Sequence, residues 1–594
     1  MTIERERIIA AARGDIPMDL VIRRAQLVNV FTAEIYEADV GVTDDRFSAI
    51  APYKNGEPTF HMEGKKIIDA QGSYLMPGFI DAHVHIESTM VTPDMFAREI
   101  IRHGTTTAVI DPHEMANVLG AEGVSYMVKA SQDLPVQILT TIPSSVPAVP
   151  GLENAGAEFH AKDIIELFNL PNVVGIAELM DYPGVIQQNP RMAKIVQAGL
   201  DYNMLNEGHA PRVSGRDLQA YLAAGVNSDH ESRGTEEVLE KLRAGMMIYI
   251  RESSASQFAH VVAEAWKEIP HAINIAMCTD DVEPNDMYHN GQMNRVVRRT
   301  IEEGVPAPLA IRFATLGGAM RYGLRDQGAI SAGYVANFLL VNSLETMDVQ
   351  DVYVKGKQIV TNGNVTEEIA SSVPPLRKNT VNLPDLTEED FLIQAPINNG
   401  QATLTTIEFT DIGTTVQGEV TLEVIDGMIT NLPSDYAYVT VINRHGTGQQ
   451  KKPFVGIIKN TGLTEGAYAT TLAHDSHNLV IIGTSAKDIL AAARQIEACG
   501  GGMCLVIDEE VKALVELPIA GLMSPKPVEE LAKEVDYFSK QAIDMGVSVG
   551  KRSPAMALSA IALTVIPDIR VSDLGLVDVV GQELIPLFKH TTES

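Results

Sequence analysis

Two histidines one residue apart, His83 and His85, close an apolar run in the segment GFIDAHVHIEST, residues 78–89. Side chains alternate between the two faces of a β-strand, so both imidazoles project from the same face near the end of this strand. Imidazoles paired in this way are a geometry that binds metal ions. An isolated pair also arises by chance, so a metal site requires further ligands from other parts of the chain.

Such ligands stand at the ends of other apolar runs. Glu178 lies in GIAEL, His209 in NEGHAP, His230 in NSDHES and Asp280 in CTDD. Together with the first pair they make six ligands, more than one tetrahedral ion needs, and two ions bridged by a carboxylate would use them all. Imidazole and carboxylate donors suit zinc, iron or manganese.

Each of these residues also has a simpler interpretation. His209 or His230 alone would be a hydrogen-bonded loop histidine, and Glu178 could be half of a structural ion pair. Asp281, next to Asp280, is the alternative ligand and base of its segment. The metal interpretation is favoured because the residues share one position, the carboxyl end of a strand.

The elements that would position these residues form a regular series. Short apolar runs alternate with amphipathic helical patterns, which predicts parallel strands and a closed (β/α)₈ barrel of the TIM type, with its site at the carboxyl ends of the strands. An open doubly wound sheet is the weaker alternative, because no phosphate-binding glycine pattern follows the first strand. The predicted strands are residues 78–85, 105–111, 136–143, 173–179, 202–209, 225–231, 246–253 and 273–281.

The segments that flank the barrel predict further domains. Residues 1–75 and 325–375 contain alternating apolar and polar stretches, and we expect them to form one small β-sandwich from both sides of the barrel, which spans 76–324. A stretch rich in proline and polar residues at 370–390 follows as a linker. Residues 385–594 are then expected to form a separate C-terminal α/β or α+β domain.

Composition limits the partners. The chain has 594 residues and a formal net charge of −31, which disfavours nucleic acids and anionic membranes as partners. No apolar stretch reaches the ~18 residues that a membrane span needs, and the first residues lack a signal core. Three cysteines cannot build a disulfide framework. We therefore expect a cytoplasmic protein.

The motifs are specific enough to suggest a family. The strand-end ligands resemble those of the amidohydrolase superfamily, although many binuclear members carry a carboxylated lysine where this chain has Glu178. Within that superfamily the chain resembles the adenine deaminases over nearly its whole length. The resemblance is carried by MPGFIDAHVHIESTM, DPHEMANVLG, GHAP, SDHES, CTDD, ATLGGAMRYGLRDQGAISAGYVANFLLV and AHDSHNLVIIG.

This resemblance implies a metal-dependent hydrolase that converts adenine to hypoxanthine and ammonia in purine salvage. A metal-bound hydroxide would attack C6, and Asp280 would move its proton to the departing amino group. Two divalent ions are expected, Mn²⁺ or Fe²⁺ ahead of Zn²⁺, in a homodimer or larger homo-oligomer. Residues that could bind the purine or donate a proton to N1 are Glu87, His113, Glu114, Glu207 and Glu231.

Other functions are also compatible with these residues. Another amidohydrolase, acting on a different heterocycle or a cyclic amide, is the alternative enzyme, and ring opening would release no ammonia. His113 and Glu114 could instead support the metal ligands. A catalytically silent scaffold is disfavoured, because all six ligands are present. The C-terminal AHDSHN, with His474 and His477, is interpreted as a structural or lid segment rather than a metal site.

Overall fold

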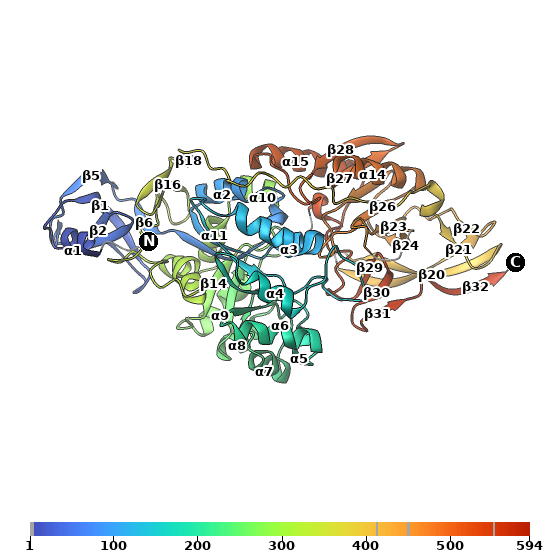
Figure 1. Ribbon diagram of the computed structural model, residues 1–594, viewed down its shortest axis with the longest axis horizontal. Helices are drawn as coiled ribbons and strands as arrows, with labels where there is room; N and C mark the ends of the chain where they lie inside the picture. Colours follow the sequence, from blue (N-terminus) through green and yellow to red (C-terminus); the bar gives the residue numbers. More distant parts are fainter. Residues whose placement is uncertain (1–4, 411–413, 448–451, 551–552, 594) are drawn as a thin grey trace.

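The computed structural model describes residues 5–410, 414–447, 452–550 and 553–593. Three parts lie side by side in Figure 1. A small sheet stands at the left, the barrel occupies the middle, and the C-terminal domain, coloured yellow to red, extends to the right. The barrel therefore contacts both of the other parts.

The barrel has the predicted parallel strands. Adjacent strands hydrogen-bond in two arcs, β11-β10-β9-β8-β7 and β12-β13-β14. The amide of Asp280 donates to the carbonyl of His83 at 3.0 Å and joins the end of the last strand to the first. Between the arcs, the amide of Gly208 donates to Ser228 Oγ at 2.8 Å. The strands are β7 (Phe79–Val84), β8 (Thr105–Ile110), β9 (Gln137–Ile142), β10 (Val173–Leu179), β11 (Leu205–Gly208), β12 (Ser228–Asp229), β13 (Met247–Arg251) and β14 (Ile275–Cys278).

Amphipathic helices surround these strands. In α8 (Thr235–Arg243), Val238, Leu239 and Leu242 are buried, and acidic residues in the first turn and basic residues in the last complement the helix dipole. Within the described chain, no helix combines the length and apolar composition needed to cross a membrane. The other barrel helices include α2 (Pro93–Arg102), α3 (His113–Ala130), α4 (Ala161–Leu167), α6 (Pro190–Asp201), α7 (Gly215–Ala223), α9 (Ala259–Glu268), α10 (Pro284–Asn290) and α11 (Met293–Glu302).

Segments from both sides of the barrel share one sheet. Strand β6 runs antiparallel to β15, with Leu75 opposite Leu340, so the chain before the barrel pairs with the chain after it. Phe338 stacks on Tyr353 at 4.4 Å between ring centroids and fills the core of this sheet. Its strands include β1 (Met18–Asn29), β2 (Glu34–Thr43), β3 (Arg46–Lys54), β5 (Gly64–Asp69), β6 (Tyr74–Pro77), β15 (Phe338–Val341), β16 (Val349–Val354), β17 (Lys357–Thr361) and β18 (Asn364–Val365).

The C-terminal domain is built on a second, mixed sheet. Helices α14 (Ala486–Cys499) and α15 (Val528–Asp544) pack on it, and β29 (Ile569–Ser572), β30 (Gly575–Asp578) and β31 (Glu583–Ile585) form a small separate sheet. Helices and strands therefore do not alternate regularly along the C-terminal domain, as they do in the barrel. The main sheet contains β20 (Gly400–Phe409), β21 (Thr415–Val424), β23 (Tyr436–Ile442), β24 (Phe454–Lys459), β25 (Ala467–Thr470), β26 (Leu479–Gly483), β27 (Gly502–Ile507), β28 (Glu510–Glu516) and β32 (Phe588–Glu593).

This domain docks on the carboxyl end of the barrel. The amide of Ser524 donates to the carbonyl of Met90 at 2.8 Å, and Asn478 Nδ2 donates to the carbonyl of Asn154 at 2.8 Å. Helix α15 packs on α10, and apolar residues of both domains belong to one continuous core. The loops that follow the barrel strands are thus covered by C-terminal residues.

Candidate active site

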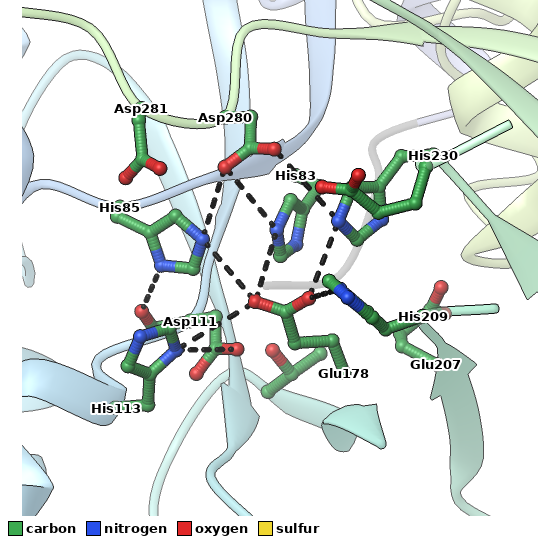
Figure 2. Close-up of polar contacts among 12 residues, drawn as sticks. His83, His85, Asp111, His113, Glu178, Glu207, His209, His230, Asp280 and Asp281 are labelled. Carbon is green, nitrogen blue, oxygen red and sulfur yellow. Dashed lines mark hydrogen bonds and ion pairs between the residues drawn. The ribbon is translucent and has the colours of Figure 1, made fainter. Parts of the chain in front are cut away.

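The carboxylate of Glu178, at the end of β10, is surrounded by histidines (Figure 2). One oxygen, Oε2, lies 2.6 Å from His209 Nδ1 and 3.2 Å from His230 Nε2. The other, Oε1, lies 3.5 Å from His85 Nε2 and 3.8 Å from His83 Nε2. His113 Nδ1 also lies 3.8 Å from Oε1, so the two oxygens face different groups of histidines, an arrangement that suits a carboxylate shared by two metal ions.

Asp280, just beyond β14, completes the cluster. Its Oδ1 is 3.3 Å from His85 Nε2 and 4.0 Å from His83 Nε2, and its Oδ2 is 3.7 Å from His230 Nε2. The φ angle of Asp280 is +59°, so a tight turn follows the strand and aims the carboxylate at the barrel axis. The structure therefore brings all six predicted metal ligands together.

The donor set of this cluster fits divalent metal ions. Imidazole nitrogens and carboxylate oxygens converge there, and they are buried except for His209, whose side chain is 14% exposed. Several distances between ligand atoms, from 3.5 to 4.0 Å, are too long for hydrogen bonds. His83 Nε2 is buried and has no hydrogen-bond partner among the described residues. A metal ion would satisfy it.

Buried groups beneath the cluster hold its strands in place. Asp81, on the same face of β7 as the two histidines, accepts hydrogen bonds from Thr279 Oγ1 at 2.5 Å and from the Thr279 amide at 3.1 Å. Gln292 also donates to this carboxylate. Burial raises the pKa of Asp81 to about 7. The first and eighth strands are thereby joined directly below the predicted metal ligands.

A second buried network fastens the loops that carry His209 and His230. Asp229 accepts hydrogen bonds from the amide of Ala210 at 2.8 Å and from Lys241 Nζ at 2.9 Å. Lys241 is fully buried and also donates to the carbonyl of Ala210 at 2.6 Å. One ammonium group therefore holds both loops, as outer groups of metal sites commonly do for their ligands.

Two residues outside the predicted set also contact the cluster. Arg251 Nε lies 2.5 Å from Asp280 Oδ2, and the same guanidinium pairs with Glu231. Asp111 Oδ2 lies 3.3 Å from His113 Nδ1, and its carbonyl is 3.0 Å from His85 Nδ1. Both residues stand at the carboxyl end of a strand, in IRES and IDPHE, and that position alone could have identified them.

The electrostatics of Asp280 follow from these neighbours. Burial raises its pKa, but the charge of Arg251 and the hydrogen bond from His85 outweigh burial and hold the pKa well below its ordinary value. The carboxylate is therefore ionised and able to accept a proton from a bound group. Asp281 has a different environment, because its Oδ1 accepts from Ser88 Oγ at 2.5 Å and its side chain is 34% exposed.

A pocket opens above the predicted metal ligands. Of the predicted substrate residues, His113 and Glu231 line this pocket. Glu114 lies beside His113 and is buried. The C-terminal domain contributes much of the wall through His474, Asp475, Ser553, Met556, Ser559, Ala560, Leu563 and Ile566.

The other two predicted substrate residues point elsewhere. Glu87 Oε1 accepts a hydrogen bond from the Met115 amide at 3.2 Å, in the first turn of α3. Glu207 lies inside the barrel, where its oxygens accept from Tyr249 Oη at 2.6 Å and Arg321 Nε at 2.9 Å. Glu87 and Glu207 are thus hydrogen-bonded to other parts of the protein. Only the residues around His113 and Glu231 remain candidates for substrate contact.

Fold and site together define a metal-dependent hydrolase, and residues 74–359 match the model of the amidohydrolase family. Residues 413–583 match the model of the adenine deaminase C-terminal domain. The chain belongs to the adenine deaminase family. It is 39% identical to the adenine deaminase of Desulfatibacillum aliphaticivorans over 98% of this chain and 100% of that one.

Relatives from other bacteria show the same full-length likeness. The adenine deaminase of Klebsiella pneumoniae is 39% identical over 98% of this chain and 95% of its own. The adenine deaminase of Kosmotoga olearia is 37% identical over 98% of both chains. The predicted family and fold class are thereby confirmed, C-terminal domain included.

Proposed function

We propose that this chain hydrolyses adenine to hypoxanthine and ammonia, by addition of water at C6 and departure of the amino group. One observation carries the proposal. Full-length likeness to adenine deaminases coincides with a buried centre of four histidines and two carboxylates at the carboxyl end of the barrel. Free adenine is the substrate, and hypoxanthine is available to purine salvage.

Two divalent ions fit the centre, where His83, His85 and Asp280 would hold one and His209 and His230 the other. Glu178 would contact both ions through its two oxygens. When bound, such ions lower the pKa of a water molecule to ~7, which supplies a nucleophile at neutral pH. We propose Mn²⁺ or Fe²⁺ ahead of Zn²⁺, which reconstitution with each metal alone would test.

Asp280 is the proposed acid–base residue. Its carboxylate accepts the proton of the attacking water and delivers it to the amino group, which leaves as ammonia. The role is supported by the contact with Arg251, which keeps Asp280 ionised and limits its rotation. An amino group leaves readily only after protonation, so this delivery is the step for which the enzyme needs Asp280.

His113 and Glu231 are proposed to contact the purine. Both line the pocket, and ring atom N1 must gain a proton as C6 becomes tetrahedral. Asp111 Oδ2 lies 3.3 Å from His113 Nδ1 and orients the ring, so His113 would contact the purine through its ring face rather than as a proton donor. Glu231 is paired with Arg251, so it reaches the pocket as a fixed carboxylate.

We also propose a cytoplasmic homodimer or larger homo-oligomer. The described cysteines, Cys278, Cys499 and Cys504, are all free, which suits a reducing compartment. Sedimentation velocity on the full chain tests the assembly, and a species with the mass of one chain at micromolar concentration would contradict it.

The test of the activity is direct. Metal-replete protein is incubated with adenine while ultraviolet absorbance and released ammonia are followed, and we expect one ammonia for each hypoxanthine formed. A parallel panel contains other aminated heterocycles and cyclic amides. Turnover of a cyclic amide without ammonia release, and none of adenine, would replace this proposal with a ring-opening amidohydrolase.

A further inference from the structure

A loop of the C-terminal domain reaches the barrel beside the metal centre. This loop, residues 473–478, connects β25 to β26 and carries the sequence AHDSHN. His474 and Asp475 lie next to His113 and Glu114, the first residues of α3. Side chains from two domains therefore meet at one point.

The distances between these four side chains resemble those between ligands of a single metal ion. His113 Nε2 lies 3.6 Å from Asp475 Oδ1 and 3.9 Å from Glu114 Oε1, and His474 Nδ1 lies 3.9 Å from Glu114 Oε1. These separations are too long for hydrogen bonds. Ligands on one tetrahedral ion, with bonds of ~2.1 Å, are about 3.4 Å apart. The observed spacing lies within about half an ångström of that geometry.

These side chains are buried, so leaving their polar atoms without a binding partner would cost folding free energy. His113, Glu114 and Asp475 are at most 4% exposed. Among the described residues, His113 Nε2, the nitrogen at the centre of this group, has no hydrogen-bond partner. Buried polar atoms are rarely left unsatisfied, and two carboxyl groups that lie 3.6 and 3.9 Å from the same imidazole nitrogen favour a cation between them.

This group of side chains is distinct from the proposed catalytic centre, although the imidazole of His113 lies next to both. His113 Nδ1 faces Asp111 and Glu178, whereas its Nε2 faces the C-terminal loop. Donor atoms of His113, Glu114 and His474 all lie within 4.8 Å of one another, and none of these residues is among the six ligands already described. His477 contacts its own loop, where its Nδ1 accepts from the Ala473 amide at 3.3 Å.

We propose that His113, Glu114, His474 and Asp475 form a third divalent-metal site, which ties the C-terminal domain to the barrel at the edge of the substrate pocket. Imidazole and carboxylate donors in this number suit Zn²⁺, Co²⁺, Mn²⁺ or Fe²⁺. Bound there, an ion fixes the loop that forms part of the pocket wall. This proposal differs from the sequence interpretation of AHDSHN, which favours a structural or lid role over metal binding.

The experiment counts metal ions and does not depend on catalysis. Metal-depleted full-length protein is titrated with Co²⁺, passed over a desalting column, and assayed for metal per chain. We expect three ions in wild type and two in His474→Ala and Asp475→Asn. The matched control is His160→Ala, which removes an exposed histidine and should keep three. Adenine turnover, measured separately, tests the proposed function on the same wild-type sample.

Several results would overturn the site. Saturation of wild type at two ions, retention of three by both variants, or loss of every ion from His474→Ala would each do so. Where a variant does not fold, as judged by circular dichroism, wild-type crystals grown with Co²⁺ decide the matter. An anomalous peak within ~2.5 Å of His474 Nδ1 supports the proposal, and the lack of a peak there in a protein whose other sites are filled rejects it.

Discussion

Arg251 Nε and Asp280 Oδ2 lie 2.5 Å apart, and both side chains are less than a tenth exposed. The guanidinium belongs to the end of β13 and the carboxylate to the turn after β14, so neighbouring strands fix the pair. An ionised carboxylate held in this way can accept a proton without rearranging, which is how preorganised groups accelerate proton transfer.

Replacement of Asp280 by Asn should separate catalysis from metal binding. The amide keeps the size and one oxygen of the side chain, but it cannot accept and deliver the proton. General acid–base catalysis contributes typically 10²–10⁴-fold, so we expect kcat to fall on that order or more, while KM for adenine changes much less. Both constants and the metal content are measured on the same samples.

Asp281→Asn is the matched control, because it makes the same change one residue along the chain. We expect its kcat to stay close to that of wild type. A metal-replete Asp280→Asn protein within about threefold of wild type would remove Asp280 from the mechanism. Asp281 would then become the next residue to test.

Replacement of Glu178 by Ala should empty the catalytic centre. The two oxygens of Glu178 face five histidines, so its loss should remove the ligand proposed to be shared by both ions. We expect a folded protein that holds at least one fewer ion per chain and has little activity, as measured by metal analysis and adenine turnover. Exposed Glu166→Ala serves as the control. A variant with full metal content and full turnover would show that Glu178 is only structural.

Lys241→Met should weaken both the fold and the second half of the centre. The change leaves Asp229 as a buried charge without its ammonium partner, and breaking a buried ion pair typically costs ~3–5 kcal/mol. We expect a lower Tm and weaker binding of the ion near His209 and His230. The control, Lys194→Met, changes an exposed lysine.

A double variant distinguishes a positioning role from general instability. Adding Asp229→Asn to Lys241→Met removes the uncompensated charge, so Tm should recover in part. Metal affinity should stay low, because the loop amides lose their anchor. Recovery of both quantities to wild-type values would show that the network does not position the ligands.

Glu153→Gln should change how stability depends on pH. Glu153 is buried between the barrel and the C-terminal domain, where its Oε1 accepts from the Val149 amide and from Thr564 Oγ1, each at 3.1 Å. Burial raises its pKa from 4.5 to about 8. The protonated form therefore favours folding, and this contribution is complete below pH ~4.5 and lost as pH rises toward 8.

Glutamine keeps both acceptor bonds and has no proton to lose. We expect Glu153→Gln to have the same Tm as wild type near pH 5 and a higher Tm above pH 8, by differential scanning calorimetry. Exposed Glu158→Gln should show no such crossover. Equal differences at both pH values would mean that Glu153 does not titrate in this range.

Much of the site can be predicted from the sequence, because the ends of the barrel strands can be recognised there. An apolar run predicts a strand, and the alternation of side chains predicts which face of the strand its last residues occupy. The parallel strands of one barrel then bring their carboxyl ends together. His83, His85, Glu178 and Asp280 were found in this way. Their roles as ligands and base stay predictions until metal and turnover are measured.

Other residues could not be placed because their surroundings depend on tertiary packing. Lys241 lies in TEEVLEKLR, where a lysine suggests an exposed helix face, yet it is fully buried. Glu207 stands at a strand end like the ligands, but it points into the barrel interior toward Tyr249. The meeting of His474 with Glu114 depends on how two domains dock, which periodicity does not specify.

The pairing of β6 with β15 has a consequence for synthesis of the chain. Leu75 emerges from the ribosome long before its partner Leu340, and the whole barrel is translated in between. The first strands can pair with one another at once, but the edge at β6 has to wait for β15. A nascent chain stalled before residue 338 therefore exposes an unpaired apolar edge, which is the kind of surface that chaperones hold and that aggregates form on.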